Sequence, residues 1–465
     1  MKVDRVIGVL VGAAVGDALG APFEFQSAGR LAASGQEMAG GGSLGWEPGE
    51  WTDDTQMGLH IAASLLARDE LDEEDIFDRF RDWLATHPRD AGIQTQRVVL
   101  SGRPWDVAAA EDFATGHAAA GNGSLMRTAT AALYFAPRGS DASSDAARRI
   151  SGLTHGDPRA GEACVILHEL IRIAAEGGDV LRSLPQALAL VAPEHRDFYA
   201  EVCDAAWQPA DAQHANGVVW VTLAQALWAL RRADSAADAI RRAVNLGGDT
   251  DTVACVTGAL AGAQWGVQAL PIRWTTAVHG KVPGDPAPVA HDYATLSALA
   301  QRLAGVTPLP LTELLGPRPP VEVAPRLWVS DLAGAAAATN PDPSRWAVIS
   351  LCRTGDHITA PDHHHVFLID DEDSNPHLDV CVRDVVDEIE RLRAEGRDVL
   401  VHCHAGESRT GLILRAWLQQ VEALSFDAAL EQARSVWPCL TQYNRDFEHL
   451  LRTVALARPS GARGV

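Results

Sequence analysis

Hydrophobic residues recur with a helical period from the N-terminus to about residue 300. Between Asp72 and Ala85 the apolar side chains stand three and four positions apart, and Asp72 is placed to cap the helix that they predict. The same period runs through residues 160–175, 218–231 and 253–265. Few stretches alternate as a half-buried strand would. The pattern predicts an all-α domain in this half of the chain.

The pattern changes after residue 304. Six prolines between residues 305 and 325 are too many for a packed helix and predict a linker. Beyond them come short apolar runs typical of buried strands, at residues 327–329, 346–351, 366–369 and 399–401. These runs alternate with helical patterns at residues 378–395 and 411–422.

This alternation of strand and helix predicts an α/β domain with a largely parallel sheet. We therefore expect two domains. Their expected bounds are 1–304 for the all-α domain, 305–320 for the Pro-rich linker and 321–465 for the α/β domain.

Composition and charge narrow the possible partners. With 47% hydrophobic and 22% charged residues the 465-residue chain is typical of folded globular proteins. A net charge of −22 argues against a general nucleic-acid or anionic-membrane binder. The apolar N-terminal stretch is interrupted by Asp4, Arg5 and Asp17, so we read it as a buried helix and expect no membrane partner. Seven cysteines without a C-x-x-C pair suggest neither a disulfide framework nor structural zinc, and favour the cytoplasm.

Two acidic clusters interrupt the helical half. Thr52-Asp53-Asp54 and Asp249-x-Asp251-Thr252 each place hard oxygen ligands on a turn that enters a helix. Such oxygens suit Mg²⁺ or Mn²⁺, and two facing clusters could hold a metal pair about 3.5–4 Å apart. The alternative is that each cluster only caps the helix that follows it. A glycine-rich turn at residues 121–124, able to bind phosphate through its backbone N–H groups, favours the functional interpretation.

These segments resemble the ADP-ribosylglycohydrolase family. The resemblance rests on GDALGAPFEF (16–25), WTDDTQ (51–56), GNGSLMR (121–127), THGDPRA (154–160) and AVNLGGDTDT (243–252), and it covers roughly residues 3–300. It implies an all-helical domain with two Mg²⁺ or Mn²⁺ ions. The implied metal ligands are Thr52, Asp53, Asp54, Asp249, Asp251 and Thr252.

The same resemblance implies the remaining residues of the site. Glu24 matches a glutamate near the scissile ribose, where it could act as a base or grip the ribose or the leaving group. Asn122, Gly123, Ser124 and His155 match positions that line the ADP-ribose pocket. Taken alone, His155 would be read as a structural histidine. Cleavage at the ribose anomeric carbon passes through an oxocarbenium-like state and needs an activated water, which a metal pair can supply.

A second group of reactive residues lies in VLVHCHAGESRTG (399–411), a predicted strand, loop and helix. Cys403 follows the strand and precedes a helix N-terminus, where the helix dipole and the loop amides stabilise a thiolate. Arg409 adds a planar guanidinium that, with the same amides, can bind phosphate oxygens. A merely buried cysteine would require neither the arginine nor the intervening glycine.

This part of the chain resembles the tyrosine and dual-specificity phosphatases over residues ~322–455. The resemblance implies Cys403 as nucleophile, Arg409 as phosphate clamp, Thr410 as the hydroxyl that assists phosphocysteine breakdown, and His402 as the residue that tunes the thiolate. It also requires a general acid.

The segment FLIDDEDSN (367–375) offers Asp370, Asp371 and Asp373 as that acid. Asp371 fits the spacing from the preceding strand best, and Asp373 is second. We read Asn444 as structural and the run of residues 363–365, three histidines, as a solvated loop.

Taken together, the sequence predicts a bifunctional hydrolase. We expect it to remove ADP-ribose from a modified protein or another ADP-ribose conjugate, and to hydrolyse a phosphate monoester on a protein or an ADP-ribose derivative. One alternative is a phosphatase regulated by an ADP-ribose-binding domain. Another is that one domain has kept ligand binding and lost catalysis, against which the complete ligand set and the Cys403/Arg409 pair argue.

Overall fold

The computed structural model describes residues 1–284, 290–307 and 316–453. The chain forms two compact units. The first contains Met1–Leu270 and Ala277–Pro308, and the second contains Pro271–Thr276 and Leu309–Val465. Of the linker expected over 305–320, residues 308–315 lie outside the described part of the chain, and the expected domain bounds stay a prediction.

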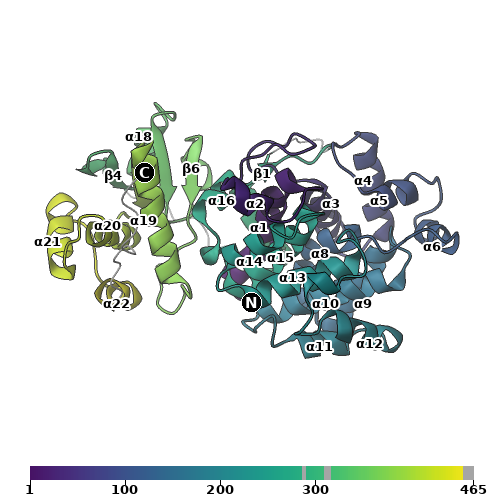
Figure 1. Ribbon diagram of the computed structural model, residues 1–465. Helices are drawn as coiled ribbons and strands as arrows, with labels where there is room; N and C mark the ends of the chain where they lie inside the picture. The colour runs from purple at the N-terminus through teal and green to yellow at the C-terminus, as the bar shows by residue number, and fades with distance from the viewer. Residues whose placement is uncertain (285–289, 308–315, 454–465) are drawn as a thin grey trace. The chain divides into compact units, whose positions relative to one another are not determined.

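The first unit is built from helices, as the sequence predicts (Figure 1). Its longest helices are α1 (Val3–Gly20), α3 (Asp53–Arg68), α4 (Glu73–Ala85), α9 (Ser140–Gly152), α10 (Pro158–Ala175), α13 (Val219–Arg232), α15 (Thr250–Trp265) and α17 (Tyr293–Leu303). The shorter ones are α2 (Arg30–Ser34), α5 (Ile93–Val99), α6 (Ala108–Ala114), α7 (Gly123–Met126), α8 (Ala129–Phe135), α11 (Leu184–Ala189), α12 (Pro193–Val202) and α14 (Ala236–Val244). Two short strands, β1 (His279–Gly280) and β2 (His291–Asp292), pair antiparallel.

Helices α1 and α15 lie side by side (Figure 1), and α1 also packs against α3, so the starts of α3 and α15, which carry the two acidic clusters, lie near the same end of α1. Glycines every four residues let the two backbones touch: a Cβ atom at Gly12 would lie 2.3 Å from the carbonyl oxygen of Gly258. At the end of this seam, a Cβ atom at Gly20 would lie 2.5 Å from the Cα atom of Asp251. By length and composition the segment Val3–Phe23 could cross a membrane, but its apolar window is fully buried in this unit. The interpretation of α1 as a buried helix is confirmed.

Local sequence signals predict several helix ends correctly. Asp72 caps α4, and its side chain accepts a hydrogen bond of 2.9 Å from the Asp75 N–H. Helices α10, α13 and α15 begin within three residues of the predicted starts. The periodic burial of apolar side chains stabilises these helices, so their positions could be predicted from the sequence.

The second unit contains a five-stranded sheet with the order β3-β4-β7-β5-β6. Its strands are β3 (Val321–Ala324), β4 (Leu327–Asp331), β5 (Trp346–Ser350), β6 (Asp362–His365) and β7 (Asp398–Cys403). All pairs are parallel except β3 with β4. The helices of this unit are α16 (Ile272–Ala277), α18 (Leu332–Thr339), α19 (Leu378–Ala394), α20 (Ser408–Gln420), α21 (Phe426–Val436) and α22 (Arg445–Thr453).

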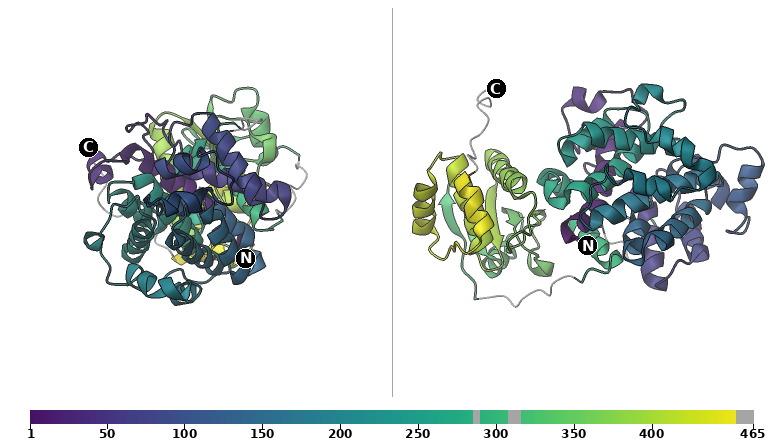
Figure 2. Two further views of the ribbon diagram at one scale, coloured as in Figure 1. Left: turned by 90° about the vertical axis from the view of Figure 1, so that its right-hand side faces the viewer. Right: turned by 90° about the horizontal axis from the view of Figure 1, so that it is seen from below.

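Apolar residues of the central strands alternate between two cores. Val348 and Leu400 pack with residues of α18 on one face. Ile349 and Val401 pack with α19, α20, α21 and α22 on the other face. The ribbon in Figure 2 shows helices on both sides of this sheet. Because both faces are covered, the strands read as continuous apolar runs, which is why β4, β5 and β7 could be predicted.

Two predictions near β6 are wrong. The strand expected over 366–369 does not form, and β6 occupies Asp362–His365 instead. The three histidines expected in a solvated loop therefore lie in a strand beside β5. A run of polar residues gives no hydrophobic signal, so the strand was not recognisable without its neighbours.

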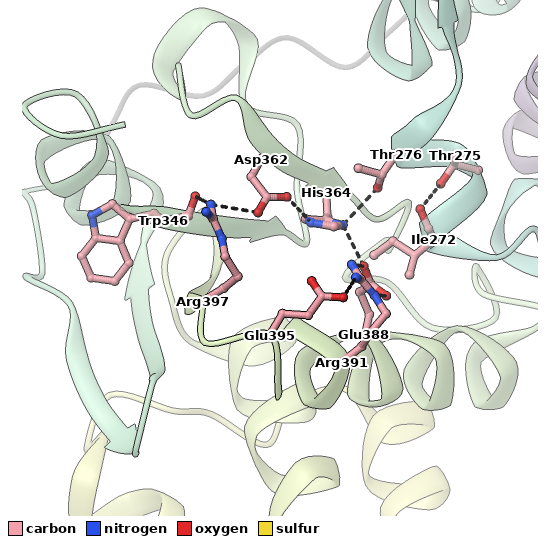
Figure 3. Close-up of polar contacts among 10 residues, drawn as sticks. All are labelled: Ile272, Thr275, Thr276, Trp346, Asp362, His364, Glu388, Arg391, Glu395 and Arg397. Carbon is pink, nitrogen blue, oxygen red and sulfur yellow. Dashed lines mark hydrogen bonds and ion pairs between the residues drawn. The ribbon is translucent and has the colours of Figure 1, made fainter. Parts of the chain in front are cut away.

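His364 is 2% exposed and is held by a polar network (Figure 3). Its Nε2 lies 2.9 Å from Asp362 Oδ1, and its Nδ1 lies 3.3 Å from Glu388 Oε1 and 3.1 Å from Thr276 Oγ1. The N–H of Ile272 donates to Asp384 Oδ2 at 2.6 Å. These contacts explain why Pro271–Thr276, remote in sequence, is part of the second unit.

Candidate active sites

Asp17 on α1 organises the loop that carries the first acidic cluster. Its carboxylate is fully buried and accepts hydrogen bonds from the Thr52 N–H at 2.9 Å, the Thr55 N–H at 3.1 Å and the Thr55 hydroxyl at 2.6 Å. These bonds fix the start of α3, where Asp53 and Asp54 stand. We did not single out Asp17 as a site residue from the sequence. The available signal was an acid inside an otherwise apolar helix.

The two acidic clusters meet at Asp54. Its Oδ2 accepts hydrogen bonds of 3.3 Å from the hydroxyls of both Thr52 and Thr252. Asp249, just before α15, is held by the Asn122 side-chain amide at 2.9 Å. Asp54 and Thr252 are 198 residues apart along the chain, so predicted ligands at the starts of α3 and α15 share one site.

Glu24 also reaches this site. Ligand oxygens of Glu24, Asp249 and Asp251 lie within 4.8 Å of one another. Burial, followed by the charges of neighbouring carboxylates, raises the pKa of Glu24 to about 9. The same two causes raise the pKa of Asp53 and of Asp251 well above the usual range of a carboxyl group. The predicted ligands therefore form one group of mutually repelling carboxylates.

The donor set fits hard divalent cations. Among the described residues, the buried oxygens Glu24 Oε2 and Asp54 Oδ1 have no hydrogen-bond partner. Unpaired buried oxygens are unfavourable, and divalent ions would give them partners and offset the repulsion between the carboxylates. Carboxylate and hydroxyl oxygens are the ligands that Mg²⁺ and Mn²⁺ prefer.

We expect the metal-free protein to lose stability as the pH rises. Burial raises the pKa of Asp17 to about 6, and Glu24 titrates near 9. In the unfolded chain these two carboxyl groups lose their protons above about pH 4, while in the folded state they keep them. The difference stabilises the folded state fully below about pH 4. This stabilisation is lost as the pH rises through the folded-state pKa of Asp17, about 6, and that of Glu24, about 9. Calorimetry in chelator should show the unfolding temperature of the first unit falling between about pH 5 and 9.

Mg²⁺ or Mn²⁺ should weaken this dependence, because a bound cation favours the ionised carboxylates. In the Glu24→Gln variant the unfolding temperature should no longer fall over the upper part of this pH interval, where Glu24 loses its proton. An unfolding temperature that rises with pH over this interval would contradict the assignment.

The predicted substrate-binding residues lie around the glycine-rich turn of residues 121–124. His155 packs against this turn, since a Cβ atom at Gly123 would lie 3.3 Å from the His155 ring. Burial, then the charge of Arg127, lowers the pKa of His155 well below its usual value, so the ring is neutral. Ser124 is fully buried, and the Asn122 amide is bonded to Asp249. Their roles toward ADP-ribose stay predictions.

Asp90 is a further acid that we missed in the sequence. Burial, then the charge of Asp249, raises its pKa, and its own charge contributes to the raised pKa values of Glu24 and Asp53. Asp90 lies between α4 and α5, in a segment that carries no motif. Only the fold brings it near Glu24, Asp53 and Asp249.

The second site lies at the carboxyl end of β7. Cys403 ends this strand, is 2% exposed, and precedes the loop that enters α20. The Arg409 guanidinium donates to the Leu351 carbonyl at 3.0 Å and to the Leu368 carbonyl at 3.3 Å. Thr410 is fully buried, and its hydroxyl has no partner among the described residues. The structure thus places the predicted nucleophile, clamp and hydroxyl around one loop.

His402 on β7 is neutral and is hydrogen-bonded to Ser350 on the neighbouring strand β5. Burial lowers its pKa to about 3. Its Nε2 lies 2.6 Å from the Ser350 hydroxyl, which also lies 2.7 Å from His363 Nε2. A hydroxyl has one proton, so Ser350 donates to one ring and accepts from the other. Ser350 and His363 were not predicted as part of this site.

Asp370 is the acid of the 367–375 segment that reaches the loop. Its carboxylate accepts hydrogen bonds from the Ser408 hydroxyl at 2.8 Å and the Tyr443 hydroxyl at 2.5 Å, and lies 3.8 Å from Arg409 Nε. Asp371 and Asp373 are exposed. The Asp371 side chain accepts from the neighbouring Glu372 N–H at 3.1 Å.

Known proteins resemble the first unit over most of its length. The ADP-ribosylglycohydrolase family model matches residues 1–311, more than half of the chain. The ADP-ribosyl-[dinitrogen reductase] glycohydrolase of Rhodospirillum rubrum is 33% identical over 282 residues, covering 60% of this chain and 92% of that protein. The ADP-ribosylarginine hydrolase Tri1 of Pseudomonas putida (strain GB-1) is 30% identical over 289 residues, covering 59% of this chain and 74% of that protein.

A different group of proteins resembles the second unit. The model of the dual specificity phosphatase catalytic domain matches residues 347–454. Dual specificity protein phosphatase 12 of Rattus norvegicus is 36% identical over 143 residues, covering 28% of this chain and 40% of that protein. Both matches are to hydrolase families. The chain belongs to the ADP-ribosylglycohydrolase family and carries, behind that domain, a dual specificity phosphatase catalytic domain.

Proposed function

We propose that the first domain releases ADP-ribose from modified arginine side chains of a protein, using two Mg²⁺ or Mn²⁺ ions. The observation that carries the proposal is the group of carboxylates formed by the buried Glu24 and Asp251 and the half-buried Asp249. The arginine acceptor is supported by the similarity to an ADP-ribosylarginine hydrolase. Thr52, Asp53, Asp54 and Thr252 complete the proposed ligand set.

The residues of the chain have separate tasks in this proposal. Bound divalent ions would polarise the ribose hydroxyls and acidify a water. Glu24 takes a proton from the attacking water or grips the ribose or the leaving group, because its carboxyl group has an unpaired oxygen and lies beside Asp249 and Asp251. Asn122 orients Asp249, and Asp17 orients the start of α3.

A release assay tests the first proposal. Purified protein and an ADP-ribosylarginine peptide should yield free ADP-ribose with Mg²⁺ or Mn²⁺ and none with a chelator. An ADP-ribosylserine peptide serves as the comparison acceptor, and faster release from serine would refute the arginine acceptor. If the protein binds ADP-ribose saturably with either metal but releases none, the first domain is a regulatory binding module.

We propose that the second domain hydrolyses phosphate monoesters through a phosphocysteine. The Cys403 sulfur forms a bond to phosphorus while the ester oxygen leaves with a proton from a general acid. Water then attacks the phosphorus, gives a proton to the same carboxylate and releases the thiolate and phosphate. Because Cys403 must remain reduced, we propose a reducing compartment such as the cytoplasm.

Asp370, rather than Asp371, is the general acid that the geometry supports. The hydroxyls of Ser408 and Tyr443 can donate to its carboxylate and accept from its protonated form, so they hold it in both states. We expect Asp370→Asn to lower kcat/KM for phenyl phosphate by about 10²–10⁴-fold. The loss should be smaller for an aryl phosphate with a more acidic leaving group, which needs less protonation.

Asp371→Asn is the matched control, because it makes the same change at the adjacent exposed position. We expect kinetics close to those of the wild type. If Asp371→Asn loses activity and Asp370→Asn retains it, the assignment from sequence spacing is correct and the one from geometry is wrong.

A further inference from the structure

The loop after Cys403 binds anions through its backbone, so the directions of its peptide planes decide whether it can hold phosphate. In a trans peptide the C=O and the N–H of the next residue point to opposite sides. A carbonyl that is hydrogen-bonded to a donor outside the loop therefore turns the following N–H toward the loop centre. Such bonds prepare an anion site before the anion arrives.

Three successive carbonyls of this loop have donors outside it. The His404 carbonyl accepts from the Leu332 N–H at 3.2 Å. The Gly406 carbonyl accepts from the indole N–H of Trp437 at 2.6 Å. Both donors belong to the folded core of the domain, since Leu332 and Trp437 are buried. They orient the amides of the residues that follow these carbonyls.

The middle carbonyl depends on a residue that the sequence assigns to the linker. Arg318 donates from one guanidinium nitrogen to the Ala405 carbonyl at 2.6 Å. Its other nitrogen donates to Glu407 Oε1 at 2.9 Å. One planar side chain thus grips the loop at two points, and its bond to the Ala405 carbonyl directs the Gly406 N–H inward.

The backbone of Arg318 is fixed as well. Its N–H donates to Asp331 Oδ2 at 3.0 Å. Its carbonyl lies so close to α18 that a Cβ atom at Gly334 would come within 1.9 Å of the oxygen. Glycine is therefore required for this approach, and the position of residue 318 is set by the domain and not only by its own side chain.

We propose that Arg318 is a positioning residue of the phosphatase reaction, which holds the Ala405–Gly406 peptide in the orientation that binds phosphate. The end of the expected linker then belongs to the phosphate site. The inference rests on the proposed phosphatase function. It also implies that a fragment beginning at Val321, the expected domain start, lacks a part of its active site.

Inhibition by inorganic phosphate tests this role in the full-length protein. We expect Arg318→Gln to weaken phosphate as a competitive inhibitor by about tenfold, and to raise KM for an aryl phosphate similarly. Arg318→Lys keeps the charge but loses the planar two-point grip, so it should also weaken phosphate. Gly334→Ala should do the same without changing the arginine. Circular dichroism and ADP-ribose release should stay unchanged in all three.

Arg345→Gln is the matched control. Arg345 pairs with Asp398 at 3.0 Å, at the opposite end of β7 from Cys403, and its loss should leave phosphate inhibition unchanged. Wild-type inhibition in Arg318→Gln would overturn the inference. Full recovery in Arg318→Lys would overturn it too, because charge alone would then suffice.

A second readout separates this inference from the proposed function. Phosphate should protect Cys403 from alkylation by iodoacetamide. In Arg318→Gln the phosphate concentration that gives half of the full protection should be about tenfold higher than in the wild type. If the wild type hydrolyses no phosphate ester but shows this protection and its dependence on Arg318, the proposed phosphatase function is refuted, and only the role of Arg318 in phosphate binding stands.

Discussion

Asp53→Asn is expected to abolish release of ADP-ribose while the protein stays folded. The change keeps the shape of the side chain and removes one charge from the site that Asp54 and Asp251 share. Loss of metal-assisted catalysis corresponds to several kcal/mol of barrier, or at least about a thousandfold in rate. The rate should be measured with the ADP-ribosylarginine peptide at saturating Mn²⁺ or Mg²⁺. Asp251→Asn is expected to behave in the same way.

The variant has a second signature in the absence of metal. Burial and the nearby charges of Asp90 and Asp17 raise the pKa of Asp53, so its ionised form is unfavourable in the metal-free protein. A neutral amide removes that cost, and metal-free Asp53→Asn should unfold at a higher temperature than the metal-free wild type. The metal-induced rise in unfolding temperature should shrink.

Asp69→Asn is the control, because it makes the same change at the exposed end of the same helix. It should alter neither release nor the response to metal. Activity that survives in Asp53→Asn after treatment with chelator would exclude the proposed metal pair.

Cys403→Ser is expected to remove phosphatase activity and leave ADP-ribose release intact. An alcohol at this position is a much weaker nucleophile than a thiolate at a helix N-terminus. Removal of a nucleophile costs on the order of 10⁴-fold or more in kcat. The test is hydrolysis of an aryl phosphate, with release from the ADP-ribosylarginine peptide measured on the same preparation.

Cys381→Ser provides the control for general effects of replacing a buried cysteine. Cys381 lies on α19 and is 4% exposed. Its replacement should lower the unfolding temperature and leave kcat for the aryl phosphate near the wild-type value. Turnover that persists in Cys403→Ser at more than background would show that another group attacks phosphorus.

The sequence determined those features that depend on neighbours along the chain. The helical period and the Asp72 cap predicted α4, and apolar runs predicted β4, β5 and β7. Cys403 and Arg409 belong to one strand–loop–helix segment, so their fixed spacing was sufficient to bring them together. Thr52, Asp53 and Asp54 lie at the start of one helix for the same reason. The positions of these residues depend on local backbone geometry, and short stretches of sequence are enough to predict that geometry.

Only the tertiary structure decided which distant residues join each site. Asp17 reaches the carboxylates because α1 packs against α3 and α15, and Asp90 comes to them from the segment between α4 and α5. No spacing along the chain encodes either approach. Asp370 faces the loop because Ser408 and Tyr443 hold it, while Asp371, one residue on, faces solvent. Arg318 lies in a proline-rich stretch that reads as a linker, yet it bonds the phosphate loop. In each case the deciding contact joins segments far apart in sequence, and its energy depends on three-dimensional packing that a one-dimensional pattern does not contain.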